Sequence, residues 1–244
     1  MTFHFLFEQS GVFKNVLKNE GYLAFDYDIS NTYGQTDFQI DLFQEIEKEY
    51  INQTVGFEQK TIFTAMRPEN DFILAFFPCT HFCEANALIY KLWNRGGKLQ
   101  FDYKNCNKLI LRNQERAKYF EIYLKFCFIC KQMGIPTIIE NPASFGKSNF
   151  LVNYSPIDVG FYEKDRSLFG DYFKKPTNFF SINFDMKENF TLFQKNIYTR
   201  RVESANGMLE RSLMSVDYAY NFYKRFLSNF LKGGTNGSIC NQKM

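Results

Sequence analysis

Several apolar segments of the chain end in side chains that can take part in chemistry. Residues 71–80 read DFILAFFPCT, so a thiol, Cys79, directly follows a proline that we expect to end a buried strand. Comparable polar side chains end three other apolar segments: Glu8-Gln9-Ser10-Gly11, Asp26 with Asp28, and Glu140-Asn141-Pro142. A thiolate is a nucleophile, and a carboxylate can bind hydroxyl groups or exchange protons. These positions therefore predict one site shared by several strand ends.

The segments between these residues alternate between strand and helix patterns. Strands are predicted at 3–8, 22–28, 36–41, 71–78, 137–140 and 179–184, and helices at 12–20, 42–51, 84–93, 107–133 and 215–231, the last with Ser215 as its N-cap. Such alternation predicts an α/β fold with a mostly parallel, doubly wound sheet and helices on both faces. In such sheets ligands bind at the carboxyl ends of the strands. We expect a single domain over 1–231 and a disordered tail over 232–244.

Composition sets limits on the class of protein. The 244 residues are 45% hydrophobic and 23% charged, as in proteins with a filled core, and the net charge of +3 permits nucleic-acid binding without arguing for it. No apolar run has the length of a membrane helix, and the N-terminal residues lack the pattern of a signal peptide. Six cysteines without such a signal indicate reduced thiols. We therefore expect a cytoplasmic protein with no membrane partner, and leave its oligomeric state open.

The motifs, taken in order, resemble the cytosine-C5 DNA methyltransferases, and more closely their short phage- and bacterial-type relatives. The pieces are LFEQSGVF after the first strand, acids after the second and third, PC after the fourth, ENP after the fifth, and then FGDYFKKPTNFF at 169–180. The resemblance covers roughly residues 3–183. It implies a Rossmann-like, S-adenosylmethionine-dependent methyltransferase fold and methyl transfer to cytosine C5, with DNA as the partner.

The resemblance also implies catalytic roles. Cys79 would add to C6 of the base as a thiolate, which requires a lowered pKa, and Glu140 would hold the N3 and amine edge of the cytosine. Asn141 and Pro142 would fix the loop that aims Glu140. Further substrate contacts are expected from Thr80, Lys174 and Lys175. No metal is expected.

For the cofactor, the family pattern points to the first three strand ends. Phe7, Ser10 and Gly11 match the loop at the methionine end, and Gly11 would let the backbone approach the ligand. Asp28 matches the acid that binds the ribose hydroxyls, with its neighbour Asp26 left open as an alternative. Two further residues complete this set: Asp41, matched to the adenine amine, and Pro78, packed beside the cofactor or the base.

The sequence also departs from the family pattern. Gln9 stands where the cofactor loop usually has a glycine, and the glutamine-arginine-x-arginine stretch is absent, with Lys174, Lys175 or Arg166 as possible substitutes. Only residues 184–214 remain where larger members carry a target-recognition domain, so stringent DNA specificity is not expected. The segment 80–104, with Gly96-Gly97, is the expected mobile loop over the base.

Each motif also has a simpler interpretation. Cys79 could be a core cysteine, or could join His81 and Cys83 in a metal site, although that spacing is not a standard zinc pattern. Asp28 could merely begin a turn with Ser30. Five other residues are interpreted as structural or solvated: His4, Cys127 with Cys130 inside a helix, and the pair Arg200-Arg201. Two functional alternatives remain, the same fold acting on RNA, single-stranded DNA or a free nucleotide, and a non-catalytic nucleotide- or cofactor-binding protein of a phage or mobile element.

Overall fold

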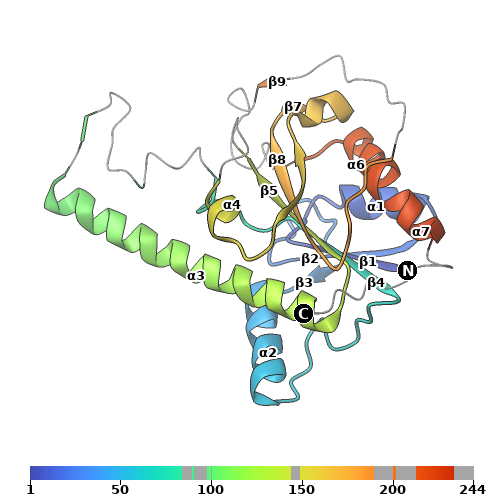
Figure 1. Cartoon of the computed structure of the whole chain (residues 1–244), viewed down its shortest axis with the longest axis horizontal. Coiled ribbons are helices and arrows are strands. Elements are labelled where there is room, and N and C mark those ends of the chain that lie inside the picture. The colour runs from blue at the N-terminus through green and yellow to red at the C-terminus, as the bar shows by residue number, and fades with distance from the viewer. Residues whose placement is uncertain are drawn as a thin grey trace.

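A twisted sheet forms the centre of the protein (Figure 1). The computed structural model describes residues 1–83, 90, 98–99, 101–143, 149–189, 200–201 and 213–233. Within them, the sheet has seven strands in the order β3-β2-β1-β4-β5-β8-β6. Their bounds are β1 (Thr2–Leu6), β2 (Leu23–Asp28), β3 (Phe38–Gln39), β4 (Asp71–Ala75), β5 (Thr137–Pro142), β6 (Val159–Glu163) and β8 (Thr177–Ile182).

The strand directions confirm the predicted fold class. Neighbouring strands are parallel from β3 to β5, whereas β8 is antiparallel to both β5 and β6. The chain adds strands on one side of β1 and then returns to add β4 on the other side, which is the doubly wound arrangement. The observed fold is therefore the predicted Rossmann-like α/β fold with a mostly parallel sheet.

Helices cover both faces of this sheet because the strands alternate apolar side chains between the two faces. On β4, Phe72 and Leu74 join one core cluster, and Ile73 and Ala75 join the other. The first cluster is covered by α1 (Val12–Asn19), α6 (Val216–Phe222), the π-helical segment η4 (Tyr223–Leu227) and α7 (Ser228–Gly233). The second is covered by α2 (Leu42–Val55) and α3 (Tyr103–Met133).

Smaller elements lie beyond the end of the sheet. They are α4 (Phe150–Tyr154), the 3-10 helix η2 (Arg166–Phe169), and the short parallel pair β7 (Phe173–Lys174) and β9 (Arg200–Arg201). The Ser215 N-cap is confirmed, since its hydroxyl accepts from the Tyr218 N–H at 2.9 Å. None of the helices in the described ranges is long and apolar enough to cross a membrane.

Two strand ends differ from the sequence prediction, and hydrogen bonding explains one of them. β4 ends at Ala75, three residues before Pro78, although the Phe76 N–H still donates to Leu6 O at 2.9 Å. β5 continues through Asn141 and Pro142, because the antiparallel β8 pairs with it to its end. Pro142 lacks an N–H, but β5 has no neighbour on its other side at this point, since its pairing with β4 stops at Ile139.

Other bounds shift by a few residues. α3 begins at Tyr103, four residues before the predicted 107, because Asp102 caps it by accepting from the Asn105 N–H at 2.9 Å. The predicted third strand, 36–41, forms only at Phe38–Gln39, and α7 runs to Gly233, past the predicted helix end at 231. The helix predicted at 84–93, the loop with Gly96-Gly97, most of 184–214 and residues 234–244 lie largely outside the described residues.

Candidate active site at the carboxyl end of the sheet

Backbone hydrogen bonds bring the first strand ends together. The Phe7 N–H donates to Tyr27 O, and the Ile40 N–H donates to Asp28 O, both at 2.9 Å. Phe7, Asp28 and Asp41 therefore lie on adjacent strand ends, as the sequence predicts for cofactor residues.

Phe7 has a backbone conformation that is unusual for a residue with a Cβ. Its φ is 60°, in the left-handed region, and such a conformation costs about 1–3 kcal/mol unless its surroundings hold it. Here its ring packs against Phe77 at 5.2 Å and Phe43 at 5.9 Å between ring centroids. Because Pro78 follows Phe77, the ring of Phe7 connects the first strand end to the Pro-Cys segment.

The loop after β1 is organised by Glu8, which we did not assign a role from the sequence. Its carboxylate accepts from the N–H groups of Ser10 at 3.0 Å and Gly11 at 2.9 Å, and also from the Ser10 hydroxyl. Glu8 is buried, and this burial raises the pKa of its carboxyl group. The sequence does contain a signal for this role. Glu8 precedes Ser10 by two residues and Gly11 by three, just before a predicted helix, and a negative charge is favourable at the N-terminus of a helix. In this structure the N–H groups of Ser10 and Gly11 thus donate within the loop itself.

Two other residues of this loop bear on the family pattern. Gly11 has φ 70° and is packed so closely that an added Cβ would lie 3.0 Å from the Cβ of Gln35. Gln9, which replaces the usual glycine, is not among the described residues with positive φ, so this position does not need a glycine here. The Gln9 Oε1 atom is buried and has no hydrogen-bond partner among the described residues.

The structure separates the candidate acids. Asp26 is fully buried, and its carboxylate accepts from Lys14 Nζ at 3.0 Å and from the Asp37 N–H at 2.6 Å, so it is already engaged by side chain and backbone groups of the protein. Asp28 is half-buried and accepts from the Ser30 N–H at 2.7 Å, which confirms the turn in the simpler interpretation. Burial raises the pKa of Asp28. Asp41 caps α2 through a single oxygen, Oδ1, which accepts from the next residues of the helix.

Cys79 lies half-buried at the start of a helical turn. Its carbonyl accepts from the N–H groups of Phe82 at 2.9 Å and Cys83 at 3.1 Å. A hydrogen bond with the Cys83 thiol, together with burial, raises the pKa of Cys79; Lys175 opposes this rise and Glu140 adds to it. The expected lowering of this pKa is therefore wrong for the structure as it stands, because the strongest neighbour is another thiol and not a cation. Lys175 and Glu140 therefore both act electrostatically on the Cys79 thiol.

The proposed metal arrangement of Cys79, His81 and Cys83 is not seen. His81 is hydrogen-bonded through Nδ1 to the Tyr90 hydroxyl at 3.0 Å, and its ring packs on Tyr119 at 4.5 Å. Across the described ranges, no group of three or more His, Cys, Asp or Glu side chains is arranged to hold a metal ion.

Glu140 is buried at the end of β5, and its basic partner is Arg166. Arg166 Nη1 lies 3.4 Å from Glu140 Oε1, while its Nη2 and Nε lie 2.5 Å and 2.7 Å from Asp171 Oδ2. Burial disfavours the charge of Arg166, but Asp171, Tyr218 and Glu140 together keep its pKa above the ordinary value. Of the three substitutes considered for the missing arginine stretch, Arg166 is therefore the one that contacts Glu140.

Neighbouring residues fix the rest of this strand end. Asn149 Nδ2 donates to Asn141 Oδ1 and to Pro142 O, both at 3.0 Å, and no pattern in the sequence indicates these contacts. Lys174 is exposed on β7, whereas Lys175 is half-buried, and Thr80 is exposed beside Cys79. Glu140, Asn141 and Pro142 thus lie on β5, next to the strand that Cys79 follows, and Lys175 acts electrostatically on Cys79.

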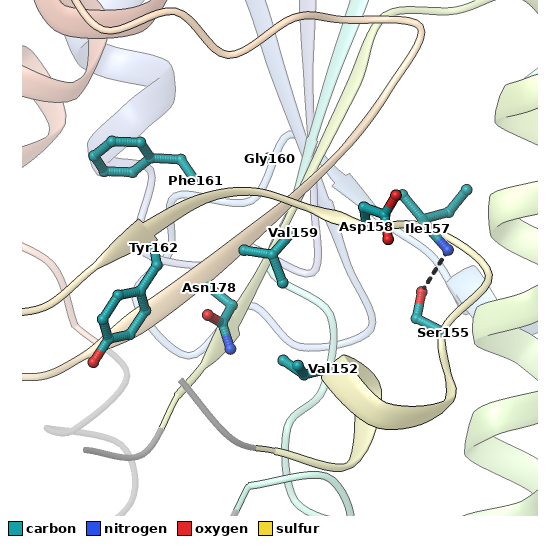
Figure 2. A pocket seen from close by; sticks show the side chains of 9 residues that line it. All are labelled: Val152, Ser155, Ile157, Asp158, Val159, Gly160, Phe161, Tyr162 and Asn178. Atoms are coloured by element: carbon teal, nitrogen blue, oxygen red, sulfur yellow. Dashed lines mark hydrogen bonds between the residues drawn. The ribbon is translucent and has the colours of Figure 1, made fainter. Parts of the chain in front are cut away.

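A surface pocket of about 540 Å³ lies elsewhere, along the outer side of β6 (Figure 2). Its lining comes from α4, the following loop, β6 and Asn178 of β8, and the Ile157 N–H donates to Ser155 Oγ at 3.0 Å on one wall. None of the residues predicted for the site lines it. Asn178 alone relates it to the site, because it pairs with Asn141 between β8 and β5.

The residues interpreted as structural behave as predicted where they are described. Cys127 and Cys130 are buried in the core under α3. His4 is buried in β1 and hydrogen-bonded to Asp71 at 2.8 Å and to Tyr27 at 3.0 Å.

Comparison with known proteins gives limited information. No family model matches the chain, and no curated protein matches it. Among solved structures, a mutant of DNMT2 from Spodoptera frugiperda is similar, with 15% sequence identity and a TM-score of 0.31. The match covers 82% of this chain and 54% of that chain, so this chain spans about half the length of the matched protein.

Proposed function

We propose that the protein is an S-adenosylmethionine-dependent methyltransferase that methylates C5 of cytosine in DNA through a covalent Cys79 adduct. The observation that supports this proposal is that Cys79 follows β4 and Glu140 lies on the neighbouring strand β5, with Arg166 Nη1 at 3.4 Å from Glu140 and with Glu140 and Lys175 acting electrostatically on the thiol. Cytosine C5 is a weak nucleophile, and it becomes reactive when a thiolate adds to C6. An acid beside that thiol, held by a buried arginine, is suited to hold the edge of the ring on which charge develops.

The residues at the first strand ends fit S-adenosylmethionine in most respects. Asp28 and Asp41 supply oxygen acceptors for ribose hydroxyls and an adenine amine, and the buried Gln9 Oε1, without a partner among the described residues, is an acceptor suited to an ammonium group. The departure is at Ser10 and Gly11, whose N–H groups are bonded to Glu8 and do not face a ligand carboxylate. When bound, the cofactor would supply the methyl group and a positive sulfonium.

Catalysis then requires Cys79 to lose its proton. The raised pKa of this thiol means that the free protein holds it protonated at neutral pH. A positive charge close to the thiol favours the thiolate, and Lys175 already acts in that direction. After methyl transfer, loss of the C5 proton to a base would break the C6–sulfur bond and restore the Cys79 thiolate.

The raised pKa of Cys79 and the self-bonded cofactor loop also favour a second candidate, a protein that binds the cofactor or a nucleotide without turnover. A third possibility is the same reaction on RNA, single-stranded DNA or a free nucleotide. It agrees with the shortness of the segment, residues 184–214, that stands where larger methyltransferases carry a target-recognition domain. The presence or absence of methyl transfer distinguishes the second candidate from the first. The identity of the methylated substrate distinguishes the third candidate from the first.

Nucleoside mass spectrometry tests these candidates directly. DNA and RNA would be analysed from methylation-deficient cells expressing the protein, Cys79→Ser, or Cys240→Ser, a matched cysteine control remote from Cys79 in the sequence. We expect 5-methylcytosine in DNA with the native chain and the control, and none with Cys79→Ser. Methylation confined to RNA would identify the third candidate. No methylation in DNA, in RNA or in the free nucleotides of the same cells, together with calorimetric binding of S-adenosylmethionine, would identify the second.

A further inference from the structure

The helix α3 is longer than the body that it packs against. Its 31 residues give a length of about 46 Å, yet its buried side chains all lie between Ile122 and Cys130. Its N-terminal half, residues 103–118, extends away from the sheet as an arm (Figure 1). The burial pattern therefore divides α3 into an anchored half and a projecting half.

The arm projects on the side of the candidate site. α3 leads through a short turn directly into β5, so it runs opposite to β5, and its start lies beyond the carboxyl end of that strand. Arg116 fixes the base of the arm, since its guanidinium lies 4.2 Å from the centre of the Tyr90 ring and 4.7 Å from that of Phe150. The Phe150 N–H in turn donates to Phe82 O at 3.2 Å, three residues after Cys79.

One face of the arm is basic, and it continues the face that contacts the core. Eighteen residues make five full helical turns, so residues 18 positions apart lie on the same face of a helix. Three cations stand in this relation to buried residues of α3: Lys104 to Ile122, Lys108 to Phe126 and Arg112 to Cys130. The face of α3 that contacts the core between Ile122 and Cys130 therefore carries these cations in the arm, which extends beyond the core.

These cations are available to a partner. Lys104 and Lys108 are exposed and Arg112 is half-buried, and none of them is ion-paired with a described carboxylate. The arm, residues 103–118, holds five basic residues and one acid, Glu115, which lies on the same face three residues after Arg112. Successive cations on this face are four residues apart, so they are about 6 Å apart along the helix. Phosphates repeat every ~3.4 Å along each strand of DNA, so such a row offers roughly one cation for every two phosphates of one strand.

We infer that this arm binds the sugar-phosphate backbone of DNA beside the base that enters the site. The choice of DNA as the partner rests on the proposed function. The inference assigns to the arm part of the DNA binding that a target-recognition domain provides in larger proteins. Phosphate contacts of this kind position a nucleic acid without reading its sequence. The exposed Tyr103 and Ile110 lie on the opposite face of the helix, so a protein partner or a second copy of the chain is the competing occupant.

The test is the salt dependence of DNA binding, measured by fluorescence anisotropy with a short labelled duplex and no cofactor. The double variant Lys104→Gln with Lys108→Gln would be compared with Lys60→Gln with Lys131→Gln, which removes the same charge at exposed positions away from the arm. We expect the slope of log K against log salt to become shallower by about 1.8 in the arm variant, and to stay unchanged in the control. The variant Lys104→Arg with Lys108→Arg should restore the native slope.

Equal slopes in the native chain and the arm variant, with helix content unchanged by circular dichroism, would overturn the inference. So would sedimentation of the native chain as a dimer that the arm variant dissociates while its DNA binding stays native, because the arm would then bind a second copy. The experiments also distinguish a failure of the proposed function from a failure of this inference. DNA binding with the expected slopes but without methylation would contradict only the proposed methyltransferase activity. Methylation with the same slope in the native chain and the arm variant would contradict only the proposed role of the arm.

Discussion

Replacing Arg166 by methionine should destabilise the protein strongly, because Arg166 is the shared partner of two buried carboxylates. Its guanidinium is fully buried, 2.5 Å from Asp171 and 3.4 Å from Glu140. Breaking a buried pair by removing one partner costs about 3–5 kcal/mol. For a chain of 244 residues, each kcal/mol lowers Tm by roughly 2–4 °C, so we expect a decrease of about 6–20 °C.

The replacement Glu140→Gln should behave differently. It leaves the pair of Arg166 and Asp171 intact, and the 3.4 Å contact that it changes is longer than the usual range for an N–H···O hydrogen bond. We therefore expect the free energy of unfolding to fall by about 1 kcal/mol or less, while methyl transfer is lost. Urea unfolding followed by circular dichroism would measure both variants.

A double-mutant cycle separates the two contacts. The coupling between Arg166→Met and Asp171→Leu should be several times that between Arg166→Met and Glu140→Gln, because the shorter contact carries more of the interaction. If Glu140→Gln destabilises the chain as much as Arg166→Met, the arginine is held mainly by Glu140. The assignment of Asp171 as its structural anchor would then be refuted.

Three further predictions follow from single residues. Gly11→Ala should destabilise by more than the approximately 1–2 kcal/mol expected from its left-handed backbone, while Gly21→Ala, with similar φ but open space around it, should cost only that amount in thermal unfolding. Cys83→Ala removes the hydrogen bond that contributes most to the raised pKa of Cys79, so alkylation of Cys79 at about pH 8, measured by peptide mass spectrometry, should become faster; an unchanged rate would contradict this cause. His4 has a pKa lowered by burial, so the unfolded chain takes up its proton first and stability should fall as pH drops through about 6.5, less so in His4→Gln.

The sequence predicted the order and type of the main elements because the apolar patterns are strong. Val12, Phe13, Val16 and Leu17 have helical spacing, and β4 is apolar on both faces. Both elements could therefore be predicted from local patterns alone, without knowledge of distant contacts. The ends of elements were less predictable. Pro142 stays within β5 only because β8 approaches it antiparallel, which no local pattern indicates.

The candidate site was predictable in its positions but not in its electrostatics. Parallel strand ends must share one edge, so Cys79 and Glu140 could be expected together. The pKa of Cys79 depends instead on which side chain lies beside the thiol, and that neighbour, Cys83, was assigned only to an alternative metal site. Likewise, Glu8 and Arg166 contribute through contacts that arise only after the loops have folded.

The packing of α6 against α1 has a consequence for synthesis of the chain. Phe13 on α1 contacts Phe222 on α6 at 5.7 Å between ring centroids, and Lys224 pairs with Glu20 at 2.9 Å. Phe13 also packs on Phe5 and Phe76, so the sheet covers one part of the apolar face of α1. The part that faces α6 is covered only after the ribosome has synthesised the residues up to Phe222, and a chain that ended before α6 would leave that part exposed, which favours aggregation.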